Sequence, residues 1–206
     1  PVTTTDELIP SGETSSYRSN PLALSEFTLS RKDPAYVGRA KEMLTVEKAR
    51  RDGADPTAEN EAVKAAFARI QEKWADVVPA ETGIGTTIFA EKPGDGSARE
   101  QAASCQKVLG GWANIAREYA TKRYRSNLIN WGMLPFVIEK GELPFGLNDF
   151  IYLPGIRTAV QEKAEVITAY TVKEDGLHAF ELRLGDLTED ERKIILDGCL
   201  INFYRN

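Results

Sequence analysis

The pattern of apolar and polar positions predicts helices in the first third of the chain. Asp33-Pro34 is typical of a helix start, and this helix is expected to run to Arg51 and stop at Gly53. Asp55-Pro56 repeats the signal for a second helix. Its apolar positions recur at steps of three and four residues: Val63, Phe67, Ile70 and Trp74. Charges on the other faces indicate a helical pair packed on the surface of a larger unit.

From residue 86 the pattern changes to strands that alternate with helices. The β-branched and apolar residues 86–90 predict a buried strand, and a helix is expected from near Ser97 to Gly110-Gly111. Further strands are predicted at Trp112–Ala116 and Phe136–Glu139, with a helix between them. The first thirty residues, rich in Ser, Thr, Pro and Gly, are interpreted as loop or extended chain.

The last quarter of the chain carries two clear local signals. Lys173-Glu174-Asp175-Gly176 is typical of a hairpin turn between strands at 165–172 and 177–184. A capping box at 188–191 opens a final helix that ends near Gly198. The irregular order of strands and helices along the chain predicts a mixed α/β fold and not an all-parallel, doubly wound sheet. No linker-like stretch divides the 206 residues, so one domain is expected.

Composition narrows the class of protein. The net charge of −5 argues against nucleic acid or an anionic membrane as the main partner, and no apolar run reaches the ~18 residues of a membrane span. Two cysteines, Cys105 and Cys199, exclude a disulfide scaffold or a zinc module. The single histidine, His178, excludes a His-rich site within the chain. Pro1 and the polar residues after it indicate a piece of a longer chain, a processed subunit or a disordered end.

The segment Gly94-x-Gly96-Ser97-x-Arg99, between a predicted strand and a predicted helix, is the strongest candidate for chemistry. Glycines allow the backbone to approach a ligand, and a helix N-terminus favours an anion. Arg99 could bind a carboxylate or phosphate in a bidentate manner. A glycine turn with a serine helix cap explains the same residues without function. The third glycine of a dinucleotide loop, the Gly-Lys-Ser/Thr of a Walker loop and the Gly-x-Ser-x-Gly of a hydrolase are absent.

Residues 94–103, Gly-Asp-Gly-Ser-Ala-Arg-Glu-Gln-Ala-Ala, resemble the Gly-x-Gly-Ser-Ser-Arg-Glu-His-Ala motif of the aconitase family's swivelling C-terminal domain. The short segments at 109–111, 127–128 and 132–135 also resemble sequences of that domain, at similar spacing. A second block, Thr4-Thr5-Asp6 followed by Gly12 and residues 17–20, is similar to the Thr-Thr-Asp, Gly and Phe-Arg-Gly stretch that opens the same domain. Residues 197–202 are similar to the end of that domain. Residues 31–78 match nothing in this resemblance. They are interpreted as a helical insertion in one swivel domain over 1–206.

The resemblance implies a swivelling β/β/α domain of the aconitase C-terminal, or small-subunit, type. The enzyme would be a hydro-lyase that dehydrates and rehydrates a hydroxy polycarboxylic acid. By position in the motif, Ser97 is the catalytic base, Arg99 and Arg18 bind substrate carboxylates, and Asp6 is an active-site aspartate. Ala98 replaces the second motif serine, so only its backbone N–H could bind substrate. Gln101 and Ile9 also depart from the family pattern, which leaves the exact substrate open.

The resemblance also implies a 4Fe–4S cluster, which the family holds through three cysteines, two of them in Cys-x-x-Cys. Cys105 and Cys199 form no such motif. The cluster is therefore expected on other domains or on a large subunit of the same enzyme, with no metal bound by this chain. The chain alone is expected to be inactive, and a cytoplasmic location is expected. The expected partners are those domains and a small carboxylic acid, without nucleic acid or membrane. The open alternatives are a non-catalytic anion-binding module and a structural interaction domain.

Overall fold

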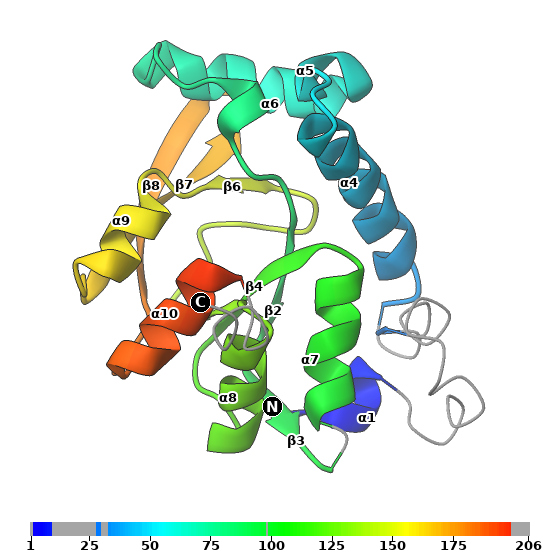
Figure 1. Ribbon diagram of the computed structural model, residues 1–206, viewed down its shortest axis with the longest axis vertical. Coiled ribbons are helices and arrows are strands. Elements are labelled where there is room, and N and C mark those ends of the chain that lie inside the picture. Colours follow the sequence, from blue (N-terminus) through cyan, green and yellow to red (C-terminus); the bar gives the residue numbers. More distant parts are fainter. Residues whose placement is uncertain (1, 10–27, 30–32, 98, 199–206) are drawn as a thin grey trace.

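The computed structural model describes residues 2–9, 28–29, 33–97 and 99–198 (Figure 1). At its centre is a six-stranded sheet with the order β2-β4-β5-β8-β7-β6. Three strands run parallel to one another: β2 (Thr86–Ala90), β4 (Gly111–Ala116) and β5 (Leu134–Val137). The other three pair antiparallel: β6 (Phe150–Tyr152), β7 (Val166–Lys173) and β8 (Gly176–Arg183). The predicted mixed α/β fold is confirmed, and so is the predicted hairpin, in which Lys173 pairs with Gly176.

A second, two-stranded sheet forms where the sequence predicts only a loop. The chain leaves the large sheet after β2 and enters β3 (Lys92–Asp95), which pairs in parallel with β1 (Val2–Thr4). Pro93 and Gly94 are poor strand residues, so local propensity conceals β3. β3 forms because it pairs with β1, the N-terminal strand. The helix α1 (Thr5–Leu8) likewise corrects the interpretation of the first residues as loop or extended chain.

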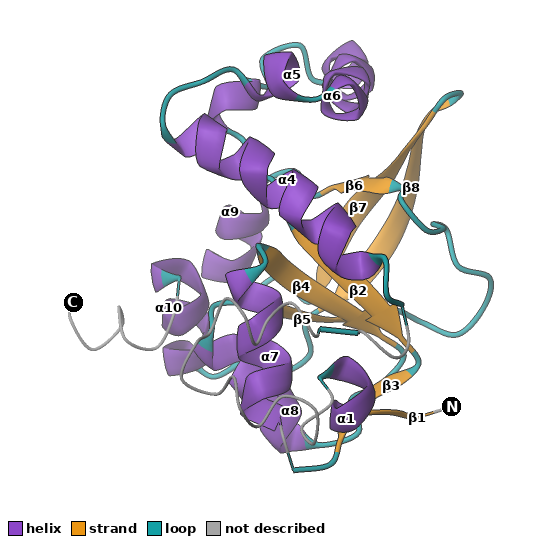
Figure 2. Ribbon diagram, turned by 90° about the vertical axis from the view of Figure 1, so that its right-hand side faces the viewer, coloured by secondary structure: helices purple, strands orange, loops and turns teal. Residues whose placement is uncertain are grey.

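Helices pack against the sheet around three apolar clusters, of which two lie beside the parallel strands. Figure 2 shows α7 (Arg99–Val108), α8 (Lys122–Asn130) and α10 (Glu189–Asp197) gathered beside the parallel strands. The first cluster joins α1, α7 and α8 to Ile88 of β2. The second joins α8, α10 and α9 (Ile156–Gln161) to the strands around Phe136. The capping box at Thr188 is present as predicted. In the described part of the chain, no helix has the length and apolar character needed to cross a membrane.

The helical segment forms as predicted, with two corrections at its helix starts. The first helix, α4 (Tyr36–Arg51), begins two residues after Pro34, because the Asp33 carboxylate pairs with Arg39 instead of capping the helix. The second is divided into α5 (Pro56–Glu59) and α6 (Glu61–Lys73) by Asn60, whose side chain accepts a hydrogen bond from the N–H of Val63 at 3.1 Å. The predicted stripe is buried against the sheet at Val63, Phe67 and Ile70. The interpretation of residues 31–78 as an insertion stays a prediction.

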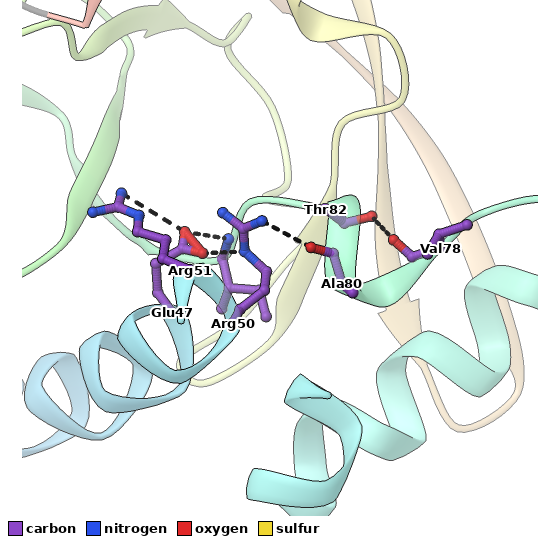
Figure 3. A network of polar contacts seen from close by, with 7 residues as sticks. Glu47, Arg50, Arg51, Val78, Ala80 and Thr82 are labelled. Carbon is purple, nitrogen blue, oxygen red and sulfur yellow. Dashed lines mark hydrogen bonds and ion pairs between the residues drawn. The ribbon is translucent and has the colours of Figure 1, made fainter. Parts of the chain in front are cut away.

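A buried carboxylate attaches α4 to the segment that precedes β2. Glu47 is 1% exposed, forms an ion pair with Arg50, and lies 3.9 Å from Arg51. Its second oxygen accepts a hydrogen bond from the backbone N–H of Ile84 at 3.2 Å. Arg50 also donates to the carbonyl of Ala80, at 3.0 Å, in the short 3-10 helix η2 (Pro79–Glu81) (Figure 3). These contacts compensate for the desolvation of the carboxylate.

Candidate active site

The two sequence blocks that carry the resemblance meet at one edge of the small sheet. Parallel strands β1 and β3 end side by side, with Thr4 opposite Asp95. Each strand is followed by a helix start: α1 after Thr4, and α7 after residues 96–98. Thr4 caps α1 by accepting a hydrogen bond from the N–H of Glu7 at 3.2 Å. Asp6 therefore lies in the first turn of α1, at the edge where ligands bind to parallel sheets.

The loop between β3 and α7 depends on both of its glycines. Gly94 and Gly96 have φ angles of +100° and +122°, which side-chain-bearing residues rarely adopt. A Cβ added at Gly94 would overlap the ring of Tyr124, with Cδ1 only 2.5 Å away. A Cβ at Gly96 would overlap the hydroxyl of Thr5. The loop thus packs directly on α8 from one side and on α1 from the other.

A third helix N-terminus is attached to the same loop. Thr121, the N-cap of α8, accepts a hydrogen bond from the N–H of Tyr124 at 3.1 Å and donates its hydroxyl proton to the carbonyl of Gly94 at 3.2 Å. Figures 1 and 2 both show α1, β3, α7 and α8 together at one end of the molecule. The N–H groups and positive dipole ends of α7 and α8 therefore face the region of the loop, which favours an anion there.

An open hollow of about 380 Å³ lies between the starts of α7 and α8. Every residue that lines it is polar: Ser97, Arg99, Glu100, Lys122, Arg123, Ser126 and Asn127. Three of these side chains are cationic and one is anionic. Within the described residues, none of the four takes part in an ion pair. The Nε of Arg99 is shielded from solvent and has no hydrogen-bond partner there. Uncompensated positive charge is what a carboxylate or phosphate would neutralise.

Ser97 is exposed and lines this hollow. α7 begins at Arg99, two residues later, and the Ser97 hydroxyl makes no hydrogen bond to any described residue. The interpretation of Ser97 as a helix cap requires such a bond to the first turn of α7. The hydroxyl is instead available to a ligand in the hollow.

Behind the loop, three buried side chains form a closed ring of hydrogen bonds. Tyr124 donates to Oδ1 of Asn114 at 2.6 Å, Asn114 donates to Oε1 of Gln106 at 2.6 Å, and Gln106 donates to the Tyr124 hydroxyl at 3.0 Å. All three residues are at most 1% exposed. Burial raises the pKa of Tyr124 far above its usual value, so the hydroxyl stays protonated. The ring joins α8, β4 and α7.

The structure brings together Ser97 and Arg99, and it places Asp6 at the same sheet edge. Arg18, Ala98 and Cys199 lie outside the described residues. Ile9 is fully buried in the core. His178, on β8, is a surface residue that lies 2.7 Å from Asp175, and Cys105 is buried.

Sequence reasoning missed Lys122, Arg123 and Ser126 as lining residues. The available signal was Thr121, a helix cap followed by two basic residues. The donor set of the hollow, with guanidinium, ammonium, hydroxyl and a single carboxylate, does not fit the thiolate ligands of an iron–sulfur cluster. In the part of the chain that the structure describes, no group of three His, Cys, Asp or Glu side chains could hold a metal ion.

The fold and the hollow define a mixed α/β domain with a cationic hollow where two helices begin. The sequence model of the aconitase C-terminal domain matches residues 37–141, just over half of the chain, and includes this loop. The chain belongs to the aconitase C-terminal domain family, and the fold class that the resemblance implied is confirmed.

Two individual proteins are similar to this chain. Aconitate hydratase A of Rickettsia bellii (strain RML369-C) is 28% identical over 126 residues, which cover 59% of this chain and 14% of that protein. The chain thus corresponds to a small part of this curated relative. The crystal structure of 3-isopropylmalate dehydratase (leuD) from Methanocaldococcus jannaschii is 17% identical. It aligns over 99% of this chain and 90% of that chain, with a TM-score of 0.49.

Proposed function

We propose that this chain is the swivel domain of an aconitase-like hydro-lyase acting on a hydroxy polycarboxylic acid. It would supply a serine base and carboxylate-binding arginines to an iron–sulfur site on other domains or on a large subunit. The observation that carries the proposal is the position of Ser97 beside Arg99, in a hollow lined by three cationic side chains and a single carboxylate, with the Nε of Arg99 lacking a hydrogen-bond partner among the described residues. Membership of the aconitase C-terminal domain family supports it.

The chemistry assigned to this chain is proton transfer. In dehydration, Ser97 as an alkoxide would take a proton from the carbon next to a substrate carboxylate while the substrate hydroxyl leaves as hydroxide toward the other domains. In hydration, Ser97 would return that proton to carbon as hydroxide adds. A serine hydroxyl becomes a base only where its alkoxide is stabilised. The N–H groups at the start of α7, the dipole of that helix and the Arg99 guanidinium supply this stabilisation.

The charge of the hollow supports a substrate with at least two carboxylates. Arg99 lies on the α7 side and Lys122 and Arg123 on the α8 side, so two anionic groups could be bound from opposite walls. Arg18 would add a further carboxylate contact by its position in the motif. A tricarboxylate or a similarly polar acid fits this set better than an apolar malate derivative does.

Replacement of Ser97 by alanine in the complete enzyme, with its cluster-bearing domains, tests the proposal. General-base catalysis contributes ~10²–10⁴-fold, so Ser97→Ala should lower kcat by at least that order. KM should change little, because arginines hold the substrate. Ser126→Ala is the matched control, since it removes another exposed hydroxyl from the same hollow. Near-normal turnover of Ser97→Ala with a lowered Tm would show that Ser97 is only a structural residue.

A non-catalytic anion-binding module is the second candidate, because the cationic hollow alone would bind phosphate or carboxylate. The two functions differ in what Ser97→Ala does. In a binding module, the variant keeps its affinity for the anion and no turnover exists to be lost. The presence of Cys-x-x-Cys and a further cysteine in the complete reading frame, or in a neighbouring one, supports the enzyme. A free-standing frame without such a partner supports the binding module.

A further inference from the structure

We propose that Tyr124 is a positioning residue: through its ring of hydrogen bonds with Gln106 and Asn114, it holds the Gly94–Ser97 loop in register with α8. The consequence for catalysis rests on the proposed function of Ser97. The positioning itself does not.

The direction of donation around the ring is the same at every step. Each hydroxyl or amide donates to the next residue and accepts from the previous one. Gln106 uses its second amide proton on the carbonyl of Ala102 at 2.9 Å, one turn earlier in α7. A buried polar network in which the members satisfy one another fixes one arrangement, because any rotation leaves a donor or acceptor unpaired in a dry interior. The ring therefore specifies how α7, α8 and β4 meet.

The loop is attached to this ring on two sides. Gly94 packs against the Cβ and ring atoms of Tyr124, which lie close to the helix backbone and cannot move aside independently. Thr121, in the turn before Tyr124, binds the carbonyl of Gly94. A displacement of Tyr124 would thus be transmitted to Gly94 and to Ser97, three residues later. The Arg99 wall and the Lys122 wall of the hollow belong to the two helices that the ring joins.

The test compares two substitutions that each remove one buried hydroxyl. Tyr124→Phe keeps the aromatic ring under Gly94 but leaves Oδ1 of Asn114 without its donor. Tyr119→Phe is the control: its hydroxyl lies 2.8 Å from the carbonyl of Phe136 and 3.3 Å from the backbone carbonyl of Asn114, so its loss removes none of the three side-chain hydrogen bonds of the ring. Amide hydrogen exchange is measured at residues 94–100 in the chain. The kcat and KM per folded active site are measured in the complete enzyme, at a temperature where all variants are folded.

For Tyr124→Phe, we expect faster exchange at 94–100 and a fall in kcat of tenfold or more, because a displacement of about 1 Å can cost ~100-fold in rate. Saturating substrate compensates for weaker binding, so the fall in kcat reports a misplaced Ser97. For Tyr119→Phe, exchange at 94–100 and kcat should stay within twofold of the parent. Unchanged loop exchange in Tyr124→Phe, or an equal effect of Tyr119→Phe, would overturn the proposal. If Ser97→Ala has normal turnover while Tyr124→Phe still accelerates loop exchange, the proposed function fails and the positioning role stands.

Discussion

Gly96 lies directly against the hydroxyl of Thr5, although the two residues belong to separate motif blocks, 94–103 and 4–6, that are far apart in the sequence. Thr5 is 2% exposed and is the first residue of α1, while Gly96 lies in the loop before α7. This contact places the start of α1 next to the loop that carries Ser97. It also explains why a glycine is required at position 96.

Gly96→Ala should therefore destabilise the fold more than backbone strain alone would. Gly141→Ala is the matched control, because Gly141 has a φ of +136° and an added Cβ would meet nothing within 4 Å. The control should lose about 1–2 kcal/mol, the cost of a left-handed residue. Gly96→Ala should exceed it by at least ~1 kcal/mol, because Thr5 must also be displaced. Urea unfolding measures both, and equal losses would contradict the contact.

Removal of the Arg99 guanidinium, whose Nε is shielded from solvent, should weaken anion binding. For Arg99→Gln, we expect the affinity for a tricarboxylate such as citrate, measured by calorimetry, to fall about tenfold, because a charged hydrogen bond contributes ~1.5–3 kcal/mol. Arg123→Gln should have a smaller effect, since this side chain is exposed. Arg69→Gln, on α6 and outside the hollow, is the control and should change nothing. Equal affinities of all three variants would exclude the hollow as the anion site.

The Glu47 ion pair gives a test of the helical segment. Arg50→Ala would leave a 1% exposed carboxylate without its main partner, and we expect a loss of ~3–5 kcal/mol in the free energy of unfolding. Arg51 contacts the same carboxylate from an exposed position, with 59% of its side chain accessible. Arg51→Ala should cost at most ~1 kcal/mol. Denaturant unfolding of the two variants separates the partners, and similar losses would show that Glu47 is partly solvated.

Stability should decrease at alkaline pH. Burial raises the pKa of Cys105 to about 11 and raises the pKa values of Tyr36, Tyr119 and Tyr124. The unfolded chain releases these protons from about pH 8.5 for cysteine and about pH 10 for tyrosine. Above those values the folded state binds more protons than the unfolded state, so the free energy of unfolding falls as pH rises. Denaturation at pH 8 and pH 10.5 measures the decrease. Tyr119→Phe should show a shallower dependence than the parent chain.

The purified chain should be colourless, contain no iron and be inactive on citrate or isocitrate. The hollow offers no thiolate, and the burial-raised pKa of Cys105 disfavours the thiolate that iron would require. Elemental analysis and the absorption spectrum are the measurements. A brown protein with absorbance near ~400 nm, the region of iron–sulfur charge transfer, would contradict the assignment of the cluster to other domains.

The sequence by itself determined the elements whose signals are local. The hairpin at 173–176, the capping box at Thr188 and the stripe on α6 depend on turn chemistry, side-chain capping and helical periodicity, all of which act within a few residues. The motif around Ser97 and Arg99 was also visible, because glycine, serine and arginine there lie in one short segment. The predictions of the hairpin, the capping box and the helical stripe held because the residues that encode each of them lie within a few positions of one another; the roles of Ser97 and Arg99 stay predictions.

Only the tertiary structure decided the features that depend on contacts between segments far apart in the sequence. β3 forms because β1 lies beside it, against the weak strand propensity of Pro93 and Gly94. Lys122 and Arg123 belong to the hollow because Thr121 and Tyr124 attach α8 to the loop, and no local pattern encodes that contact. The ring of Gln106, Asn114 and Tyr124 likewise joins three elements whose side chains meet only after folding. Hydrogen bonds and packing between distant segments cannot be read from spacing along the chain, because the sequence order does not fix which surfaces come together.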